Sequence, residues 1–131
     1  NLPILRLSEV YLNAAEAAAK LNDKASTVKY LNEIIKNRTD DTKQLVTEST
    51  ATLERVLLER RKELVGEGQR FFDAMRNNET ITRYTNEKGW HYSINKESQV
   101  FDRSYFRAIL PIPVSETNAN PILKAQQNPG Y

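Results

Sequence analysis

The sequence predicts a mainly α-helical protein: a tetratricopeptide-like helical repeat scaffold of about four helices, a short β-hairpin and an extended, proline-rich C-terminal tail. Three observations lead to this fold class. Apolar residues recur at helical spacing through most of residues 4–77. Two short segments rich in β-branched and aromatic residues flank a glycine-containing turn between residues 80 and 94. Prolines then recur from residue 111 onward, where they favour extended chain and turns.

The first two helices are predicted over residues 4–22 and 25–37. The apolar stripe of the first is Leu7, Val10, Tyr11, Ala14, Ala18 and Leu21, and the inward face of the second is Val28, Leu31, Ile34 and Ile35. The first helix is also crowded with alanine, which lets a neighbouring helix approach closely. The pair with its turn spans about 34 residues, the size of one tetratricopeptide-like repeat. Because such repeats need about three neighbours to bury their faces, we expect this fragment to self-associate or to be marginally stable.

A polar loop at residues 39–47, expected to be mobile, precedes a third helix predicted over residues 50–66. Ser49 or Thr50 is expected to cap this helix, because a hydroxyl oxygen accepts hydrogen bonds from free backbone N–H groups.

A fourth helix is predicted over residues 69–77. Gly66 and Gly68 weaken the helical backbone just before it. We therefore expect a kink or a break between the third and fourth helices.

The hairpin is predicted from strands at residues 80–85 and 90–94, joined by the turn Asn-Glu-Lys-Gly at 86–89. Residues 108–113 contain two prolines and must run extended. The remainder, to Tyr131, is rich in turn-forming residues and is expected to pack as irregular chain over the helices.

Length and composition fit a single domain with one core, over residues 1–131. The formal charge is only +2, and its 19 basic and 17 acidic residues are interleaved, so nothing indicates a nucleic-acid partner or an anionic lipid surface. No apolar run approaches the ~20 residues of a membrane-spanning helix. With no cysteine and one histidine, His91, the sequence predicts no metal site, and it contains no cofactor-binding motif.

Acids and bases lie within helical reach of one another along residues 59–76. We interpret them as a structural ion-pair network formed by Glu59, Arg60, Arg61, Glu63, Glu67, Arg70 and Asp73. The alternative is a catalytic function, in which Glu59, Glu63, Glu67 and Asp73 supply paired carboxylates as in a glycosidase. The structural interpretation is preferred because each acid has an arginine at helical reach, and such networks more often fix packing.

Three segments carry a family resemblance. The first matches the patterns E-R-R-x-E-L and E-G-x-R-[FW]-[FW]-D at Glu59, Arg60, Arg61, Glu63, Leu64, Glu67, Gly68, Arg70, Phe71, Phe72 and Asp73. The second is a terminal signature at residues 110–113, Glu116, Asn120, Pro121, Leu123 and 127–131, and a weaker third spans residues 6–17. In this order and spacing they resemble the C-terminal region of the SusD/RagB family. One departure is Gly66, where members usually carry a large apolar or aromatic residue.

The resemblance implies a non-enzymatic glycan- or nutrient-binding subunit on the outer membrane of Bacteroidetes-type bacteria. Its expected partners are an oligosaccharide or other nutrient and a TonB-dependent, SusC-like transporter. Members carry a lipid anchor on an N-terminal cysteine, so we expect this chain to be truncated at its N-terminus. In the family the terminal signature is a closing strap, which implies that Tyr131 is the natural end.

Ligand contact is predicted at Trp90, His91 and Tyr92, because flat aromatic faces stack on sugar rings and polar groups bind their hydroxyls. A core position for Trp90 is the alternative, since a lone tryptophan is commonly a core anchor. The alternative function for the whole chain is a helical-repeat adaptor that binds a protein partner and no sugar.

Overall fold

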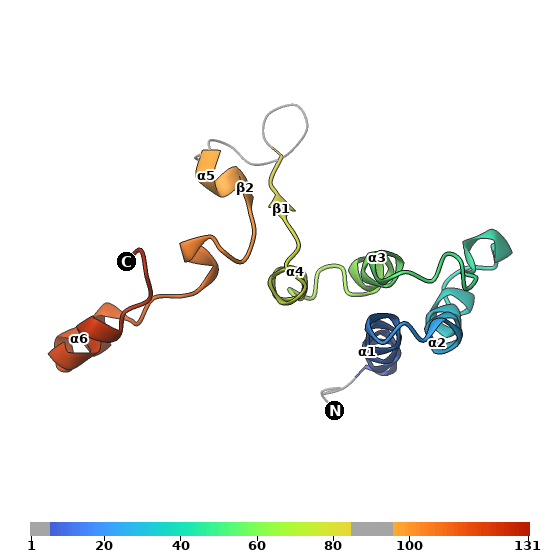
Figure 1. Ribbon diagram of the computed structural model, residues 1–131, viewed down its shortest axis with the longest axis horizontal. Helices are drawn as coiled ribbons and strands as arrows, with labels where there is room; N and C mark the ends of the chain where they lie inside the picture. Colours follow the sequence, from blue (N-terminus) through green and yellow to red (C-terminus); the bar gives the residue numbers. More distant parts are fainter. Residues whose placement is uncertain (1–5, 85–95) are drawn as a thin grey trace. The chain divides into compact units, whose positions relative to one another are not determined.

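The structure is a computed structural model that describes residues 6–84 and 96–131 (Figure 1). It divides into two compact units, Asn1–Arg70 and Phe71–Tyr131, and each is described by itself. The division concerns packing within the chain, so the prediction of a single domain stays a prediction.

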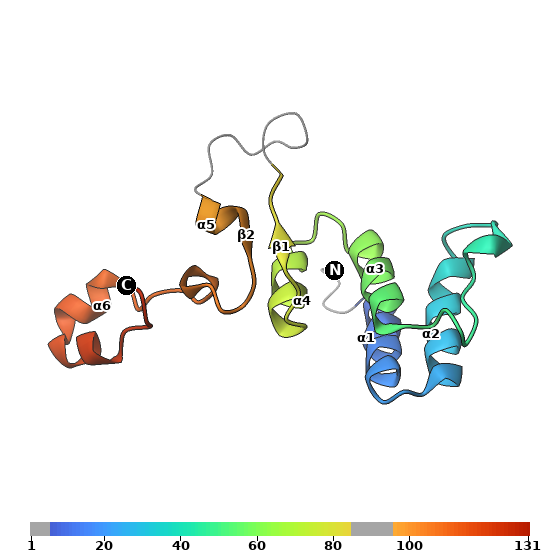
Figure 2. The same ribbon diagram turned by 45° about the horizontal axis from the view of Figure 1, so that its top comes forward.

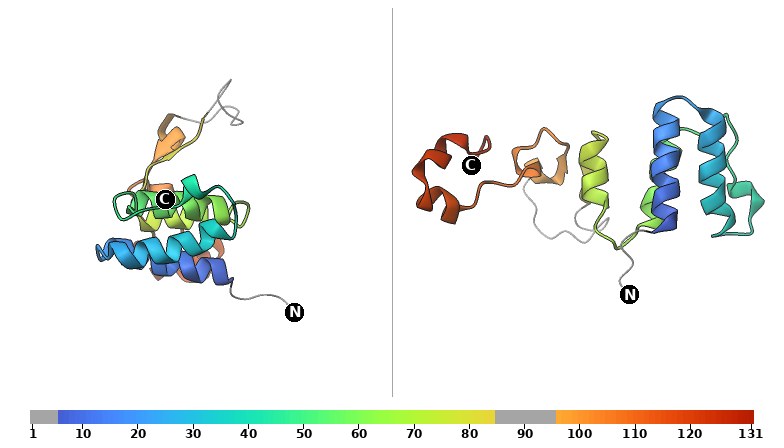
Figure 3. Two further views of the ribbon diagram at one scale, coloured as in Figure 1. Left: turned by 90° about the vertical axis from the view of Figure 1, so that its right-hand side faces the viewer. Right: turned by 90° about the horizontal axis from the view of Figure 1, so that it is seen from below.

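The first unit is built from three helices: α1 (Leu7–Lys20), α2 (Lys24–Lys36) and α3 (Leu53–Glu63). α1 and α2 form an antiparallel hairpin, seen side by side in Figure 3. α3 packs against α1, as Figure 2 shows. Asn22 takes a positive φ of 59° in the turn, and the Asp23 side chain caps α2 by accepting a hydrogen bond from the Ser26 N–H at 3.0 Å. The predicted helical hairpin is therefore confirmed.

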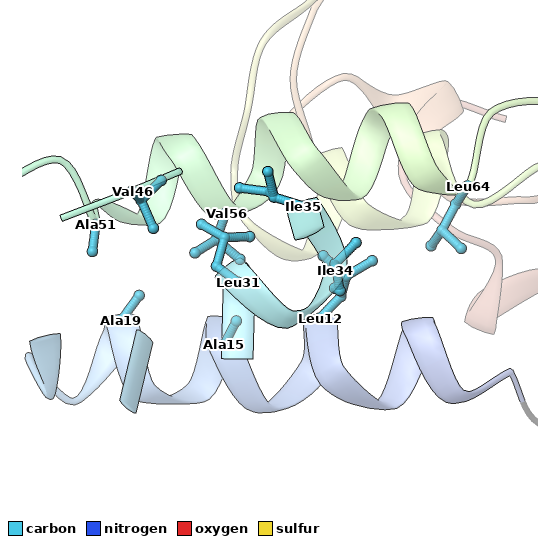
Figure 4. Close-up of a cluster of buried hydrophobic side chains, with 10 residues drawn as sticks. All are labelled: Leu12, Ala15, Ala19, Leu31, Ile34, Ile35, Val46, Ala51, Val56 and Leu64. Carbon is cyan, nitrogen blue, oxygen red and sulfur yellow. The ribbon is translucent and has the colours of Figure 1, made fainter. Parts of the chain in front are cut away.

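The hydrophobic core lies between these helices (Figure 4). Its members are Leu12, Ala15, Ala19, Leu31, Ile34, Ile35, Val46, Ala51, Val56 and Leu64. The inward face predicted for α2 is confirmed at Leu31, Ile34 and Ile35, which all belong to this core. The stripe predicted for α1 is buried only in part: Ala18 is buried and Tyr11 packs against the core, whereas Leu7 and Leu21 are 72% and 80% exposed. Leu12 and Ala15, which the stripe left out, are fully buried. The alanine-rich helix is apolar around most of its circumference, so periodicity alone did not identify the side that packs.

The loop after α2 is anchored at its end. The Asn32 side-chain amide donates to the Val46 C=O and accepts from the Val46 N–H, both at 2.9 Å. These two hydrogen bonds resemble those between paired β-strands, and they hold Val46 in the core. The expectation of a mobile loop did not include this anchor. A short 3₁₀ turn, η1 (Thr42–Gln44), precedes it. The cap of α3 is Thr52, which accepts from the Arg55 N–H at 3.2 Å, so the prediction of Ser49 or Thr50 is wrong by two or three residues.

The predicted break between the third and fourth helices is confirmed. α3 ends at Glu63 and α4 (Arg70–Arg76) begins seven residues later. Gly66 and Gly68 have φ angles of +82° and +76°. Residues with a Cβ rarely adopt this region, so glycine is what allows the chain to leave the helix here.

The second unit contains one two-stranded antiparallel sheet among its described residues. β1 (Ile81–Thr82) pairs with β2 (Val100–Phe101) in the register Ile81 with Phe101 and Thr82 with Val100. The first predicted strand is thus present at Ile81–Thr82, and it pairs with β2. The partner segment predicted at residues 90–94 lies outside the described residues. The short helix α5 (Lys96–Gln99) leads into β2.

The tail is more regular than predicted. Ile109 and Pro113 have extended backbone conformations, as predicted from the two prolines of this segment. Around it lie η3 (Phe106–Ala108), α6 (Val114–Ala119) and η4 (Pro121–Gln126), so the irregular tail expected after residue 113 is wrong. Asn120 explains part of this, because its side chain accepts from the Ile122 N–H at 3.2 Å and starts η4.

The last residues fold back on the extended segment and form a C-terminal clasp. The Gln127 side chain accepts from the Ile112 N–H at 2.8 Å and donates to the Ile112 C=O at 3.1 Å. The Asn128 amide donates to the Leu110 C=O at 2.5 Å, and the Tyr131 hydroxyl donates to the Ile109 C=O at 3.0 Å. The end of the chain is thus fastened to the residues that precede α6.

Candidate functional site

Two open grooves in the first unit share Arg38 in their linings. The first has a volume of about 440 Å³ and is lined by Arg6, Leu7, Ser8, Tyr11, Glu33, Ile34, Asn37 and Arg38. The second has a volume of about 390 Å³ and is lined by Arg38, Thr39, Asp41, Gln44, Glu59, Lys62 and Glu63. Both are large enough for a small ligand, so the groups that line them decide what they can do.

Glu63 lines the second groove and is the centre of a charged cluster with Arg6 and Arg38. Arg38 donates from Nε to Oε2 at 2.8 Å and from Nη2 to Oε1 at 2.7 Å, which is a bidentate pair. Arg6 Nη2 donates to the same Oε1 at 2.9 Å and also forms an ion pair with Glu67. The Glu63 side chain is only 5% exposed, whereas those of Arg6 and Arg38 are 38% and 53% exposed.

This environment keeps Glu63 ionised. Hydrogen bonds from Arg38 lower the pKa of Glu63 against the opposing effect of burial, and Ser8 and the charge of Arg6 also lower it. The hydrogen bonds and the charge of Glu63 in turn raise the pKa of Arg38. A carboxyl group that holds its charge this firmly is a poor proton donor, so Glu63 is unsuited to the general acid of a glycosidase.

The cluster joins the ends of three helices. Arg6 is the N-terminal cap residue of α1, Arg38 follows the C-terminal cap of α2, and Glu63 is the last residue of α3. Helix positions that are distant in sequence meet because α1 packs against both α2 and α3. The arrangement acts as an electrostatic clamp at one end of the three-helix unit.

Glu59 and Arg60 are buried and belong to two other groups. Glu59 binds Arg55 at 2.5 Å and Lys62 at 3.5 Å, all within α3. Arg60 Nη1 donates to the Asn13 side chain at 2.7 Å, and Arg60 Nη2 lies 3.6 Å from Glu9. Arg60 therefore ties α3 to α1, and its side chain is only 6% exposed.

The contacts thus distribute the predicted network over several groups. Glu63 and Glu67 share Arg6, whereas Glu59 and Arg60 have the partners just given. In the second unit, Asp73 accepts from Arg76 at 2.9 Å. Arg61 is exposed and Arg70 is half-buried. The purely structural role of these residues stays a prediction.

Sequence reasoning missed Arg6 and Arg38 as partners of Glu63. Spacing rules reach only three or four residues along a helix, and these arginines lie 57 and 25 residues away from Glu63. One signal was present: each is a basic residue just outside a predicted apolar stripe, at a helix end.

The predicted ligand contacts Trp90, His91 and Tyr92 lie outside the described residues. Within residues 6–84 and 96–131, no group of three or more histidine, cysteine, aspartate or glutamate residues is placed to hold a metal ion. The same part of the chain has no helix that is both long and apolar enough to span a bilayer.

Comparison with known proteins gives a family and several solved structures. The chain matches the SusD family over residues 1–131. It is 51% identical to a SusD superfamily protein from Bacteroides thetaiotaomicron VPI-5482, with a TM-score of 0.84 and coverage of 96% of this chain and 27% of that one. It is 45% identical to a SusD superfamily protein from Bacteroides vulgatus ATCC 8482, with a TM-score of 0.80 and coverage of 98% and 27%.

A proposed sugar-binding protein from Bacteroides vulgatus ATCC 8482 is 44% identical, with a TM-score of 0.84 and coverage of 99% of this chain and 29% of that one. This chain therefore spans less than a third of the length of the solved structures that it matches. Such relatives have a tetratricopeptide-like helical fold, which confirms the predicted fold class. Comparison with curated proteins gives no match.

Proposed function

Because this chain belongs to the SusD family, we propose that it forms the helical scaffold of a non-enzymatic, glycan-binding protein that supplies an uptake system of the outer membrane. One observation carries this proposal: the match to the family extends over residues 1–131. A relative with 44% identity, a proposed sugar-binding protein, supports it.

The charged contacts support a scaffold role for the described residues. The most buried carboxylates around the grooves, Glu59 and Glu63, already bind cations of the same chain. A sugar would have to compete with these charge-assisted hydrogen bonds for the same groups. We therefore propose that ligand contact comes from the segment with Trp90, His91 and Tyr92, and from parts of the protein outside residues 1–131.

The partner follows from the same family membership. We propose that the protein is held at the outer membrane by a lipid anchor and delivers its ligand to a TonB-dependent, SusC-like transporter. No nucleic acid or cofactor enters this proposal, because the charge is balanced and the sequence has no cofactor motif.

The test is glycan binding by the protein expressed from its full reading frame. We expect retention in gels that contain a bound glycan, and loss of retention on Trp90→Ala, since stacking supplies much of the affinity for a sugar ring. Tyr84→Ala is the matched control, because Tyr84 is an exposed aromatic residue that is not one of the predicted contacts. Unchanged retention of a folded Trp90→Ala protein would remove Trp90 from the site.

A second outcome distinguishes the adaptor function. If no glycan on a broad array is bound, and affinity purification from outer membranes recovers a protein partner without sugar, the glycan-binding proposal is wrong. Recovery of a TonB-dependent transporter together with glycan binding supports both parts.

A further inference from the structure

Four aromatic rings in the second unit form a row that leads from the strand pair to the last residue, and we call it the aromatic row. Its members, in spatial order, are Phe101, Tyr105, Phe106 and Tyr131. The ring centroids of successive members are 5.5, 5.2 and 5.3 Å apart. The interplanar angles are 48°, 63° and 68°, so the rings meet tilted or edge to face, as aromatic pairs prefer. The row therefore connects β2 to the C-terminal clasp by direct contacts.

The first end of the aromatic row holds the two strands together. β1 and β2 share only two residue pairs, and a two-stranded ladder is marginally stable without further packing. Phe101 of β2 supplies such packing, because it is only 7% exposed. The Arg83 guanidinium lies 4.9 Å from the centroid of the Phe101 ring, and the Arg83 N–H donates to the Gln99 C=O at 2.7 Å. The chain that leaves β1 and the chain that enters β2 are thus joined at this ring.

The other end of the aromatic row belongs to the C-terminal clasp. Gly130 lies so close to Phe106 that a Cβ on it would be 2.6 Å from Cδ2 of that ring. Tyr131 packs edge to face on Phe106 and donates its hydroxyl to the Ile109 C=O at 3.0 Å. Phe106 is therefore in contact with Tyr105 on the strand side and with the last two residues on the clasp side.

The strand pair closes the part of the sequence that carries the predicted ligand contacts. Residues 83–99 connect β1 to β2. The contacts predicted within them are Trp90, His91 and Tyr92. The first and last residues of this connection are Arg83 and Gln99, which are bonded to each other beside Phe101. Whatever stabilises the strand pair therefore fixes both ends of the connection.

We infer that Tyr131 is a positioning residue for ligand binding, which acts through the aromatic row to keep the two ends of residues 83–99 together. This inference rests on the proposed function, because that proposal assigns the ligand contacts. Removal of the Tyr131 ring takes away one side of the packing around Phe106, and the loss passes through Tyr105 to Phe101. Strands that open in a larger fraction of molecules weaken binding, since the apparent Kd rises as the binding-competent fraction falls.

The test compares Tyr131→Ala with Tyr131→Phe in the protein expressed from its full reading frame. Alanine removes the ring, whereas phenylalanine keeps it and loses only the hydroxyl that bonds to Ile109. Hydrogen exchange measured by mass spectrometry follows the peptide that contains the Arg83 N–H. We expect its exchange to accelerate at least about fivefold in Tyr131→Ala and less than about twofold in Tyr131→Phe.

Two controls separate this effect from a general loss of stability. Ile122→Ala shortens a side chain of the same unit that is 73% exposed, and it should leave the exchange at Arg83 unchanged. A peptide from α1 should exchange at the same rate in every variant, because α1 belongs to the first unit. The inference is overturned if Tyr131→Ala leaves the exchange at Arg83 unchanged, if α1 accelerates equally, or if Tyr131→Phe has the effect of alanine.

A second measurement is the affinity for the array glycan that the native protein binds most strongly. Tyr131→Ala should raise the Kd at least about threefold, and Tyr131→Phe should restore it to within about twofold of the native value. Accelerated exchange with an unchanged Kd would show that the aromatic row holds the strands but does not position the ligand contacts, which overturns the inference while the proposed function stands. If the native protein binds no glycan, the proposed function fails and the positioning role fails with it, whereas the exchange result still decides whether the row couples the clasp to the strands.

Discussion

Arg38 and Glu63 form a bidentate pair across 25 residues of sequence, with donor–acceptor distances of 2.8 and 2.7 Å. One partner follows α2 and the other ends α3, so the pair fixes two helices that are joined by a long loop. Arg6 reaches the same carboxylate from the start of α1. A single glutamate therefore links all three helices of the first unit.

Glu63→Gln is expected to destabilise the protein by about 1 to 2 kcal/mol, because it weakens charge-assisted hydrogen bonds from two arginines and removes the negative charge that faces Arg38, whereas Arg6 keeps Glu67. The value is below that of a fully buried pair since both arginines are partly solvated. Urea unfolding measures the change. Glu48→Gln, on an exposed loop, is the control and should change the free energy of unfolding by less than about 0.5 kcal/mol. Equal effects of the two variants would contradict the clamp.

The contribution of Glu63 should also depend on pH. Its pKa in the folded protein is lower than its ordinary value of 4.5, so the unfolded chain binds more protons between the two values. The stabilisation is therefore complete above about pH 4.5 and is lost as the pH falls through the lower folded pKa. The difference in unfolding free energy between the native protein and Glu63→Gln should shrink as the pH is lowered from 6 toward ~3. A difference that stays constant over this range would show that the charge of Glu63 does not matter.

Gly66→Ala should destabilise the first unit by about 1 kcal/mol, because the positive φ of +82° is strained for a residue with a Cβ. The added Cβ would meet no neighbouring atom within 4 Å, so the backbone conformation is the only cost. Gly66→Asn should cost less, since asparagine tolerates the left-handed region better. Denaturant unfolding of the two variants measures the order. If alanine is no worse than asparagine, backbone conformation is not what requires glycine there.

Gly130→Ala should open the C-terminal clasp. A Cβ at this position would lie 2.6 Å from Cδ2 of Phe106, and the residue has a φ of +94°. Release of the last residues exposes the Ile112 N–H, which is bonded to Gln127, so its hydrogen exchange should accelerate at least about tenfold. Exchange measured by NMR gives the result, with the Ala19 amide of α1 as the internal control. Unchanged exchange at Ile112 would mean that the clasp does not depend on this glycine.

The α2 face illustrates what periodicity predicts well. Leu31, Ile34 and Ile35 are almost fully buried, as their spacing indicates. In α1 the same rule selected Leu7, Val10 and Leu21, which are exposed. The difference is that α2 has one apolar side and α1 has two, so spacing identified the helix but not the side that packs in this unit.

The candidate site shows a similar division. The sequence indicated Glu59, Arg60 and Glu63 as charged residues of one segment, and all three side chains are buried next to charged groups of other residues. Asn13 and Glu9 were not predicted as partners of Arg60, because choosing among many polar residues requires knowing how helices pack. Arg55 was also not predicted, although it lies four residues before Glu59, at a spacing that sequence reasoning can reach. The clasp formed by Gln127 and Asn128 was also beyond sequence reasoning, since side chain to backbone contacts have no periodic pattern.

By itself the sequence determined the helices of the first unit, the glycine break after α3, the extended chain around Pro113 and the family resemblance. These features depend on local conformational preferences or on the order of residues, and both can be recognised from short segments of the sequence. The tertiary structure alone decided that Arg6 and Arg38 meet at Glu63, that β1 pairs with β2, and which side of α1 forms the core. Each of these depends on segments far apart in sequence that come together only when apolar surface is buried between them.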